Sequence, residues 1–269
     1  QCAASVRRSS SALRKIGPGE LMLSGAQANT FTGGTLVSTG KLTLKKTESV
    51  RAVSALTITN QGQVWLGRSH QIETSAPVTV YNGGLLNLGG FNQSLNALSL
   101  AGGLVDSGAG TLTLLGDLNA TSGGTLRGKV SLGGAMRRFK FMPELMLDCE
   151  ISDGPGVGGL VLDGSVLHLQ RSNSFSGPVY LNCTPIITAS GALGRAGGNV
   201  FVTNASQIYL RSNAVIVGRS LVVANDNCVL NAQDNNAWTG PIELINTNSI
   251  LVLAGLENTS LILGGAISG

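Results

Sequence analysis

The chain of 269 residues carries a net charge of +4, and only 12% of its residues are charged and 4% aromatic, against 38 glycines. Charged residues at about half of their usual one-quarter share argue against a helical bundle, whose exposed faces need Lys and Glu. The glycines follow no Gly-X-Y period, which excludes collagen, and no apolar run reaches the ~18 residues that a membrane-spanning helix needs.

Basic residues form three groups that lie far apart in the sequence, at residues 7–15, 41–51 and 137–140. A nucleic-acid site needs a basic stripe interleaved with aromatic residues, so no nucleic-acid partner is expected. Residues 1–16 are predicted to be a basic N-terminal segment, followed by a single β-solenoid over residues 17–269. The sequence stops directly after a strand pattern without a capping segment, which indicates a piece of a longer chain.

From residue 20 onward, short runs of alternating aliphatic and polar residues are separated by Gly, Asn, Asp or Ser. This period of two predicts β-strands with one aliphatic face, and no window shows a convincing helical period. Without helices a βαβ crossover is impossible, and the few Asn-Gly and Asp-Gly turns cannot join so many strands into hairpins. We therefore expect an all-β solenoid of stacked coils with parallel sheets.

The same period predicts which side chains face the core. We expect ten leucines to be buried in stacks between coils, while Thr43 and Thr113 lie on the opposite face of their strands. These leucines are Leu21, Leu23, Leu42, Leu44, Leu112, Leu114, Leu160, Leu162, Leu261 and Leu263.

Residues 133–158 break the rhythm of the strands. Residues 136–141 are basic and aromatic, and residues 143–153 are rich in acidic side chains. We expect a protruding loop or an irregular coil here, rather than a boundary between domains.

One short motif recurs along the chain: Asn, a small residue, an aromatic residue, Ser or Thr, then Gly. An imperfect repeat of this kind, followed each time by an alternating strand, predicts a stacked architecture. Asparagine at the turns of such a stack is expected to adopt left-handed backbone or to form side-chain ladders. The three copies contain Asn29, Phe31 and Gly33, then Asn173, Phe175 and Gly177, then Asn236, Trp238 and Gly240.

Residues 19–25, 29–35 and 40–44 together resemble the autotransporter-associated β-strand repeat, and the likeness recurs at residues 160–181 and 235–269. The resemblance implies a right-handed parallel β-helix that is secreted or exposed on the cell surface. In large bacterial surface proteins such repeats form one part of a longer chain. The fold leaves the biochemical activity open.

Asp148 and Glu150 are the weak candidates for catalysis. They belong to an acidic cluster and would point to the same side of an extended strand, about 7 Å apart. That spacing permits glycoside cleavage, which needs two carboxylates, although an exposed strand is the favoured interpretation. His70 and His168 have no evident partner in the sequence and are interpreted as surface residues.

Cysteines and cofactor motifs give no sign of a redox or metal site. No Cys-x-x-Cys, phosphate loop or calcium repeat occurs, so no cofactor or metal is expected. Cys149 and Cys228 lie within apolar runs and are interpreted as small buried hydrophobes, with a disulfide between neighbouring coils as the alternative. Whether Cys183 is paired stays open.

The favoured function is a non-enzymatic structural protein outside the cell: a stalk, an adhesin or a surface-layer component. One alternative is a filament subunit that associates with itself head to tail, because the ends of a solenoid expose strand edges. Another is a polysaccharide-cleaving β-helix enzyme. The expected partners are further copies of this chain, surface glycans or other surface proteins.

Overall fold

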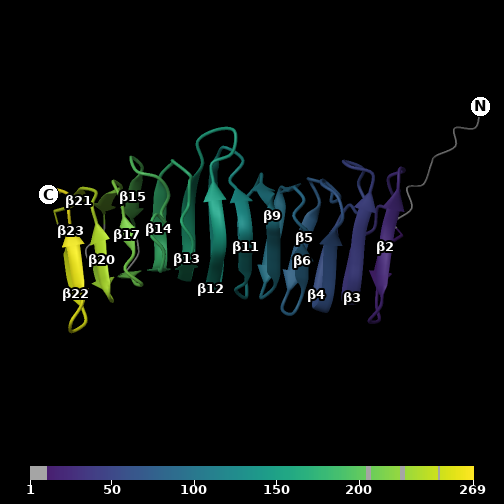
Figure 1. The fold of residues 1–269 in the computed structure, drawn as a ribbon, viewed down its shortest axis with the longest axis horizontal. Coiled ribbons are helices and arrows are strands. Elements are labelled where there is room, and N and C mark those ends of the chain that lie inside the picture. The colour runs from purple at the N-terminus through teal and green to yellow at the C-terminus, as the bar shows by residue number, and fades with distance from the viewer. Residues whose placement is uncertain (1–10, 204–206, 225–227, 248) are drawn as a thin grey trace, which may run out of the picture.

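A computed structural model describes residues 11–203, 207–224, 228–247 and 249–269, so that the outermost ten residues of the predicted N-terminal segment, Cys2 included, lie outside the described part. Its described residues contain strands and turns but no helix, and the strands stack in parallel into a solenoid of about 12 turns. Figure 1 shows the elongated stack running from the N-terminal strands to the C-terminal ones. The predicted all-β solenoid of stacked coils is confirmed.

Ladder A is the longest continuous row of hydrogen-bonded strands, and it uses the first part of each long strand. Its members are β1 (Leu13–Lys15), β3 (Thr35–Lys46), β4 (Leu56–Leu66), β5 (Pro77–Tyr81), β8 (Ala97–Ala101), β10 (Leu118–Ala120), β12 (Met136–Ser152), β13 (Gly159–Leu169), β14 (Val179–Ile187), β15 (Asn199–Val202), β18 (Ser220–Val223), β21 (Ile242–Leu244) and β24 (Ile267–Ser268).

Ladder B runs beside ladder A and takes the later parts of β3, β4, β12, β13 and β14. It is completed by β2 (Glu20–Gly25), β6 (Leu85–Asn87), β9 (Leu104–Leu114), β11 (Thr125–Ser131), β16 (Gln207–Leu210), β19 (Cys228–Ala232) and β22 (Leu251–Gly255).

Ladder C is interrupted. It consists of β7 (Gln93–Leu95) with the ends of β9, β11 and β12, and of a separate sheet of β17 (Val215–Ile216), β20 (Asn235–Trp238) and β23 (Ser260–Leu263).

Coil length varies along the stack, because residues paired in register are between 18 and 25 positions apart. Val166 pairs with Thr184, whereas Ile242 pairs with Ile267. Two strands that ladders A and B share, β3 and β4, bend at left-handed backbone, with φ of 68° at Gly40 and 55° at Asn60. Glycine and asparagine adopt this conformation most readily, so the short polar runs of the sequence become corners.

The inward side chains form aliphatic columns that run parallel to the solenoid axis. One column stacks Leu42, Val64 and Leu86 through successive paired strands, each fully buried. Six of the ten leucines predicted to be inside are at most 1% exposed, namely Leu42, Leu44, Leu112, Leu114, Leu160 and Leu162. The other four, Leu21, Leu23, Leu261 and Leu263, are partly buried and pack against the core, because they belong to the outermost coils and lack a neighbour on one side.

Thr43 lies on the face opposite its flanking leucines, as predicted, but it is only 7% exposed. Its neighbours in ladder B are Met22 and Trp65, which cover it from both sides along the axis. The Thr43 hydroxyl also donates a 2.5 Å hydrogen bond to Glu20 Oε1. Burial on this outer face therefore comes from stacked neighbours. Thr113 is half-buried.

Two regions differ in detail from the sequence interpretation. The solenoid begins at β1, four residues before the predicted start at residue 17, since Leu13 pairs with Thr35 in ladder A. Residues 133–158 contain the long strand β12, whose register with β13 shifts between Phe141 and Glu144. A loop rises above its neighbours beside β12 (Figure 1). An irregular coil and a protruding loop are thus both present.

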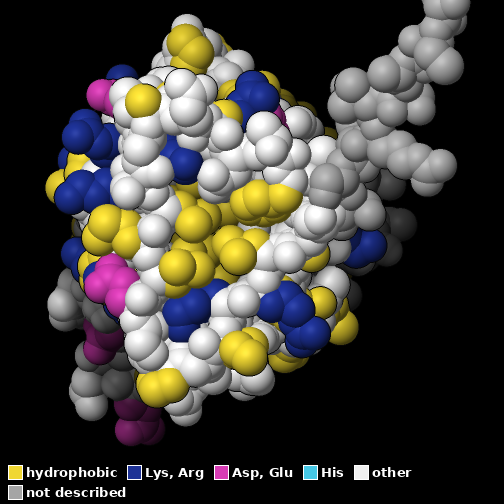
Figure 2. Space-filling view, turned by 90° about the vertical axis from the view of Figure 1, so that its right-hand side faces the viewer, with side chains coloured by type: hydrophobic (Ala, Val, Ile, Leu, Met, Phe, Trp, Pro, Cys, Tyr) yellow, Lys and Arg dark blue, Asp and Glu magenta, His cyan; other side chains and the backbone are white. Residues whose placement is uncertain are grey.

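Seen from the side that carries β2, the molecule shows hydrophobic side chains gathered near the middle of its face, with Lys and Arg around them (Figure 2). Leu21, Leu23 and Phe31 are the partly buried residues of the first coils that pack against the core. The buried hydrophobic residues of the described coils form one core cluster, and these three residues extend it toward this end of the molecule.

Candidate functional site

Four charged residues of alternating sign follow one another along the outer side of ladder B. Asp106 lies on β9, Arg127 on β11 and Asp148 on β12, and each pairs in register with the next. Each follows an inward residue of the same column, as Arg127 follows the buried Leu126. Because side chains alternate across a strand, these three must point outward. Arg171, just after β13, extends the row.

Distances between these groups shorten along the row. Arg127 Nη1 lies 4.0 Å from Asp106 Oδ2, and Arg127 Nε donates to Asp148 Oδ2 over 3.4 Å. Arg171 Nε donates to Asp148 Oδ1 over 2.6 Å. The arginines are 49% and 62% exposed, so their ion pairs lie at the surface. Each such pair adds at most about 1 kcal/mol to stability.

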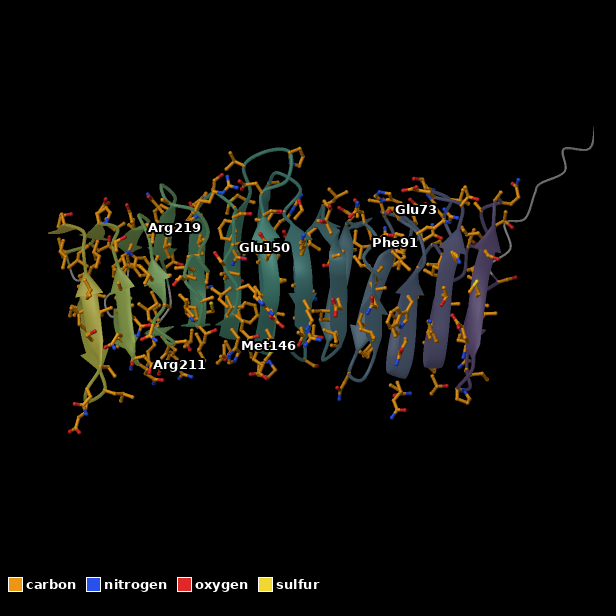
Figure 3. The ribbon with its side chains drawn as sticks, viewed as in Figure 1. Glu73, Phe91, Met146, Glu150, Arg211 and Arg219 are labelled. Carbon is orange, nitrogen blue, oxygen red and sulfur yellow. The ribbon has the colours of Figure 1, made fainter. Side chains whose placement is uncertain are left out.

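These side chains line an open pocket of about 370 Å³, which we call the charged groove: Asp106, Gly108, Arg127, Gly128, Lys129, Asp148, Glu150 and Arg171. Both carboxylates proposed from the sequence, Asp148 and Glu150, lie in it. Figure 3 marks Glu150 on β12. The cations of the groove were not predicted from the sequence, although Arg127 and Arg171 lie one coil away from Asp148, at 21 and 23 residues.

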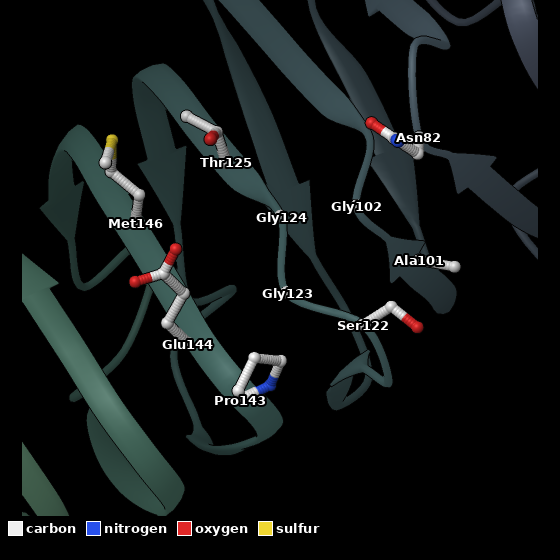
Figure 4. Close-up of a pocket in the computed structure, with 10 residues that line it drawn as sticks. All are labelled: Asn82, Ala101, Gly102, Ser122, Gly123, Gly124, Thr125, Pro143, Glu144 and Met146. Atoms are coloured by element: carbon white, nitrogen blue, oxygen red, sulfur yellow. The ribbon is translucent and has the colours of Figure 1, made fainter.

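A second pocket, of about 380 Å³, lies where coils of β8, β10, β11 and β12 meet, and its floor is glycine-rich (Figure 4). Among the described residues that line it, Glu144 alone is charged, and its Oε2 is 3.5 Å from His168 Nε2. His168 faces outward as predicted, with a quarter of its side chain exposed, but the expectation that it has no partner is wrong. His70 is exposed in a turn with φ of 56°.

The motif asparagines bind main-chain groups of neighbouring coils. Asn236 Oδ1 accepts a 2.8 Å hydrogen bond from Ala214 N, and Nδ2 donates to Leu210 O of the preceding coil over 3.2 Å and also to Gln233 O of its own coil. Asn173 Oδ1 accepts from Ile151 N over 2.7 Å, while Nδ2 donates to Ala192 O. Asn29 Nδ2 donates to Ala52 O over 2.8 Å. None of the three has left-handed backbone, so their contacts are of the coil-to-coil kind.

Aromatic and glycine positions of the last two motif copies converge on one buried cation, Arg219. Phe175 lies under its guanidinium, with the ring centroid 5.2 Å away, and Gly177 O accepts from both Nη1 and Nη2. Trp238 Nε1 donates to Arg219 O over 2.8 Å. A Cβ on Gly240 would come 1.9 Å from that same carbonyl oxygen, which explains the glycine there. Gly33 and Phe31, in the first copy, are partly buried.

No sequence pattern pointed to Arg219, which lies in none of the three basic groups. Its side chain is fully buried, with Nε donating to Arg195 O over 2.8 Å and Nη2 donating to Phe175 O over 3.4 Å. Burial lowers the pKa of Arg219 to about 10, which the negative charge of Asp153 partly offsets. The guanidinium therefore remains charged at neutral pH and holds the carbonyl oxygens of two preceding coils.

The described cysteines Cys149, Cys183 and Cys228 are free and buried, which excludes a disulfide among them. Burial raises the pKa of Cys183 to about 12 and that of Cys228 to about 11. These thiols are therefore protonated and unreactive. Among the residues that the structure describes, no three His, Cys, Asp or Glu side chains lie close enough together to hold a metal ion.

No helix in the described ranges has the length and apolar character needed to cross a bilayer.

Two segments, residues 13–44 and 104–126, match the family model of the passenger-associated transport repeat. No curated protein and no solved structure matches the chain. The first segment spans β1 to β3 and the second spans β9 to β11, so both coincide with coils of ladders A and B. The chain thus carries the passenger-associated transport repeat, which confirms the predicted resemblance to autotransporter-associated β-strand repeat proteins.

Proposed function

We propose that this chain is a non-enzymatic stalk segment of a secreted, surface-attached protein. The observation that carries the proposal is the uninterrupted parallel stack: about 12 turns, each about 4.8 Å high, make a rod of about 58 Å. The repeat family supports a secreted or cell-surface location. A stack with one continuous core resists bending, which is the mechanical property that a spacer needs.

Length is the property to test, and the register permits whole coils to be removed. Thr35, Leu56, Val78 and Leu98 are successive partners in ladder A, so deletion of residues 35–97 joins Gly34 to Leu98 and removes three coils. The deletion should shorten the rod by about 14 Å. It leaves the charged groove in place, because that groove begins at Asp106.

For the measurement, each variant is displayed on the surface of cells. Resonance energy transfer is then measured between a dye attached beyond the outer end of the rod and a dye in the cell membrane. We expect transfer to rise in the deletion variant and to fall when residues 35–97 are duplicated. A tip distance that follows neither change would contradict the stalk. Thermal unfolding of both purified variants checks that the joined coils are folded.

A polysaccharide-cleaving enzyme is the second candidate, because Asp148 and Glu150 share one groove with three cations. Asp148 is already bound by two arginines, which favours a structural role for it. The test is release of new sugar ends from neutral and uronate-rich polysaccharides by the wild-type protein and by Asp148→Asn and Glu150→Gln. We expect none; release that either substitution abolishes would establish the enzyme.

Head-to-tail association into filaments stays a separate proposal. Its support is that strand edges at the end of a parallel stack are unpaired, and that repeated contact between unlike ends makes an open fibre. Sedimentation velocity over a hundredfold range of protein concentration tests it. Discrete monomers throughout that range would rule out the filament.

A further inference from the structure

The acceptor atoms of the charged groove are largely occupied by its own donors. Asp106 Oδ1 accepts a 2.8 Å hydrogen bond from Gly108 N, and its Oδ2 faces Arg127. Both oxygens of Asp148 accept from arginine Nε atoms. Only the exposed Glu150 has a carboxylate that makes no hydrogen bond or ion pair with any residue the structure describes.

The donors of the groove are not used up in the same way. Arg171 binds Asp148 through Nε, and neither of its Nη atoms makes a hydrogen bond within the described part of the chain. The ammonium of Lys129, exposed on the next outward position, is likewise unengaged among those residues. Although the groove contains three cations and three carboxylates, its remaining hydrogen-bonding capacity is therefore mainly that of cationic donors.

A guanidinium edge with two free Nη groups matches a carboxylate, which it binds through two parallel hydrogen bonds. A nearby ammonium adds charge without demanding a direction. Glu150, a free carboxylate in the same groove, is suited to accept hydrogen bonds from hydroxyl groups. The ligand that fits carries a carboxylate and several hydroxyls within the span of one groove.

We propose that the charged groove binds a uronic-acid-containing polysaccharide, with its carboxylate on Arg171 and Lys129 and a ring hydroxyl on Glu150. Binding is lateral, on the outer side of ladder B, so a long chain can pass along the row of Asp106, Arg127 and Asp148. A divalent cation is a poorer fit, because these carboxylates form no metal-binding cluster in the described residues. This inference goes beyond the stalk and does not depend on it.

Binding of polygalacturonate by the purified full chain, measured by calorimetry with dextran as the neutral comparison, tests the proposal. The double variant Arg171→Gln/Lys129→Gln removes both free donors and should weaken binding about tenfold or more. Arg51→Gln/Lys45→Gln is the matched control: Arg51 is 64% exposed and paired with Glu73, Lys45 is exposed, and neither lines the groove. The control should bind within about twofold of the wild type.

Three results would overturn the site. They are no binding of polygalacturonate by the wild type, equal binding of dextran, or an equal loss in the two double variants, which would mean attraction to the overall positive charge alone. Glu150→Gln gives a second test. It replaces one of the two acceptor oxygens of the exposed carboxylate by an NH2 donor, and it should weaken the binding of polygalacturonate by removing half of the acceptor capacity for ring hydroxyls. Stronger binding by Glu150→Gln would mean that the Glu150 carboxylate repels the carboxylates of the polysaccharide, and it would overturn the proposed hydrogen bond from a ring hydroxyl to Glu150. Unfolding temperatures of all variants within a few degrees of the wild type establish that each one folds.

Discussion

Two arginines in this molecule make opposite use of the same side chain. Arg219 is fully buried at a corner of the stack, and its donors are directed at the carbonyl oxygens of Phe175, Gly177 and Arg195. Arg171 is 62% exposed and uses only Nε. Figure 3 places Arg219 near the upper edge of the stack, away from Glu150 in the charged groove.

The difference separates structure from recognition. The N–H donors of a buried cation need acceptors within the protein. A buried donor without an acceptor destabilises the fold, because it has lost its hydrogen bond to water. The N–H donors of an exposed cation need no acceptor within the protein, because they form hydrogen bonds with water until a ligand displaces that water. Arg219 should therefore matter for stability and little for binding, and Arg171 the reverse.

A large loss of stability is expected at Arg219. Substitution by Ala should lower the free energy of unfolding by about 3–4 kcal/mol, because carbonyl oxygens lose charged donors and a cavity forms. Urea unfolding at neutral pH measures it. Arg171→Ala, its exposed counterpart, should change stability by less than about 1 kcal/mol. Similar losses at the two sites would break the comparison.

Core leucines sharpen the contrast between the middle and the outermost coils. Leu162 is fully buried between neighbouring strands, whereas Leu263 is only partly buried. Leu162→Ala should cost about 2–5 kcal/mol. Leu263→Ala should cost about 1 kcal/mol, because less apolar surface leaves the protein interior. Chemical unfolding of both variants measures the two losses in unfolding free energy. Equal losses would show that the outermost coil is packed as well as the middle of the stack.

Most of the fold was predictable because a period of two fixes which residues share a face. That rule put Leu42, Leu44, Leu160 and Leu162 inside before any coil was placed. It could not state how far a leucine of the outermost coils is covered, since this depends on the neighbour along the axis. Thr43 shows the same limit on the outer side, where Met22 and Trp65 cover it.

The candidate site was harder to predict because coil length is irregular. Asp148 and Glu150 were found from neighbours in sequence, but the partners of Asp148 lie 21 residues before and 23 after it. A fixed spacing of one coil would have exposed the row of charges, yet paired residues here are 18 to 25 apart. Arg219 was beyond reach, since it bonds to carbonyls 42 and 44 residues earlier in the chain.

A smaller loss is expected at Asn236, a buried side chain whose amide oxygen and nitrogen are both hydrogen-bonded. It is 1% exposed and accepts from Ala214 N while donating to Gln233 O. Asn236→Ala removes the shorter of the two hydrogen bonds of Ala214 N, which also donates to Arg211 O over 3.2 Å, and removes the donor to Gln233 O, so it should cost about 1–3 kcal/mol. Asn119→Ala, on the exposed side of β10, is the control and should stay within about 0.5 kcal/mol. Thermal unfolding compares the stability of the two variants. If Asn236→Ala did not change the stability, the motif asparagine would have no structural role.

The smallest expected effect is the pH dependence contributed by Asp153, which faces the same corner. Burial raises the pKa of Asp153, but hydrogen bonds from Ser176 and Gly158, together with the charge of Arg195, lower it by more, so that it lies below its usual range. A carboxyl whose pKa is lower in the folded state stabilises the fold above its unfolded pKa of about 3.9. This contribution is lost as the pH falls through the lower, folded pKa.

Substituting Asp153 by Asn removes the charge while keeping one acceptor oxygen for Ser176 or Gly158. The variant should be less stable than the wild type at pH 7. The gap in unfolding free energy should narrow as the pH falls below about 4, where Asp153 of the unfolded chain takes up a proton, and should be lost as the pH falls through the lower pKa of the folded state. Urea unfolding at pH 7 and at pH 2.5 measures the two gaps. Glu48→Gln, at an exposed turn, should leave both unchanged. A gap for Asp153→Asn that stays constant with pH would show that the ionised carboxylate contributes nothing, and that the corner is held by Arg219 and the main chain alone.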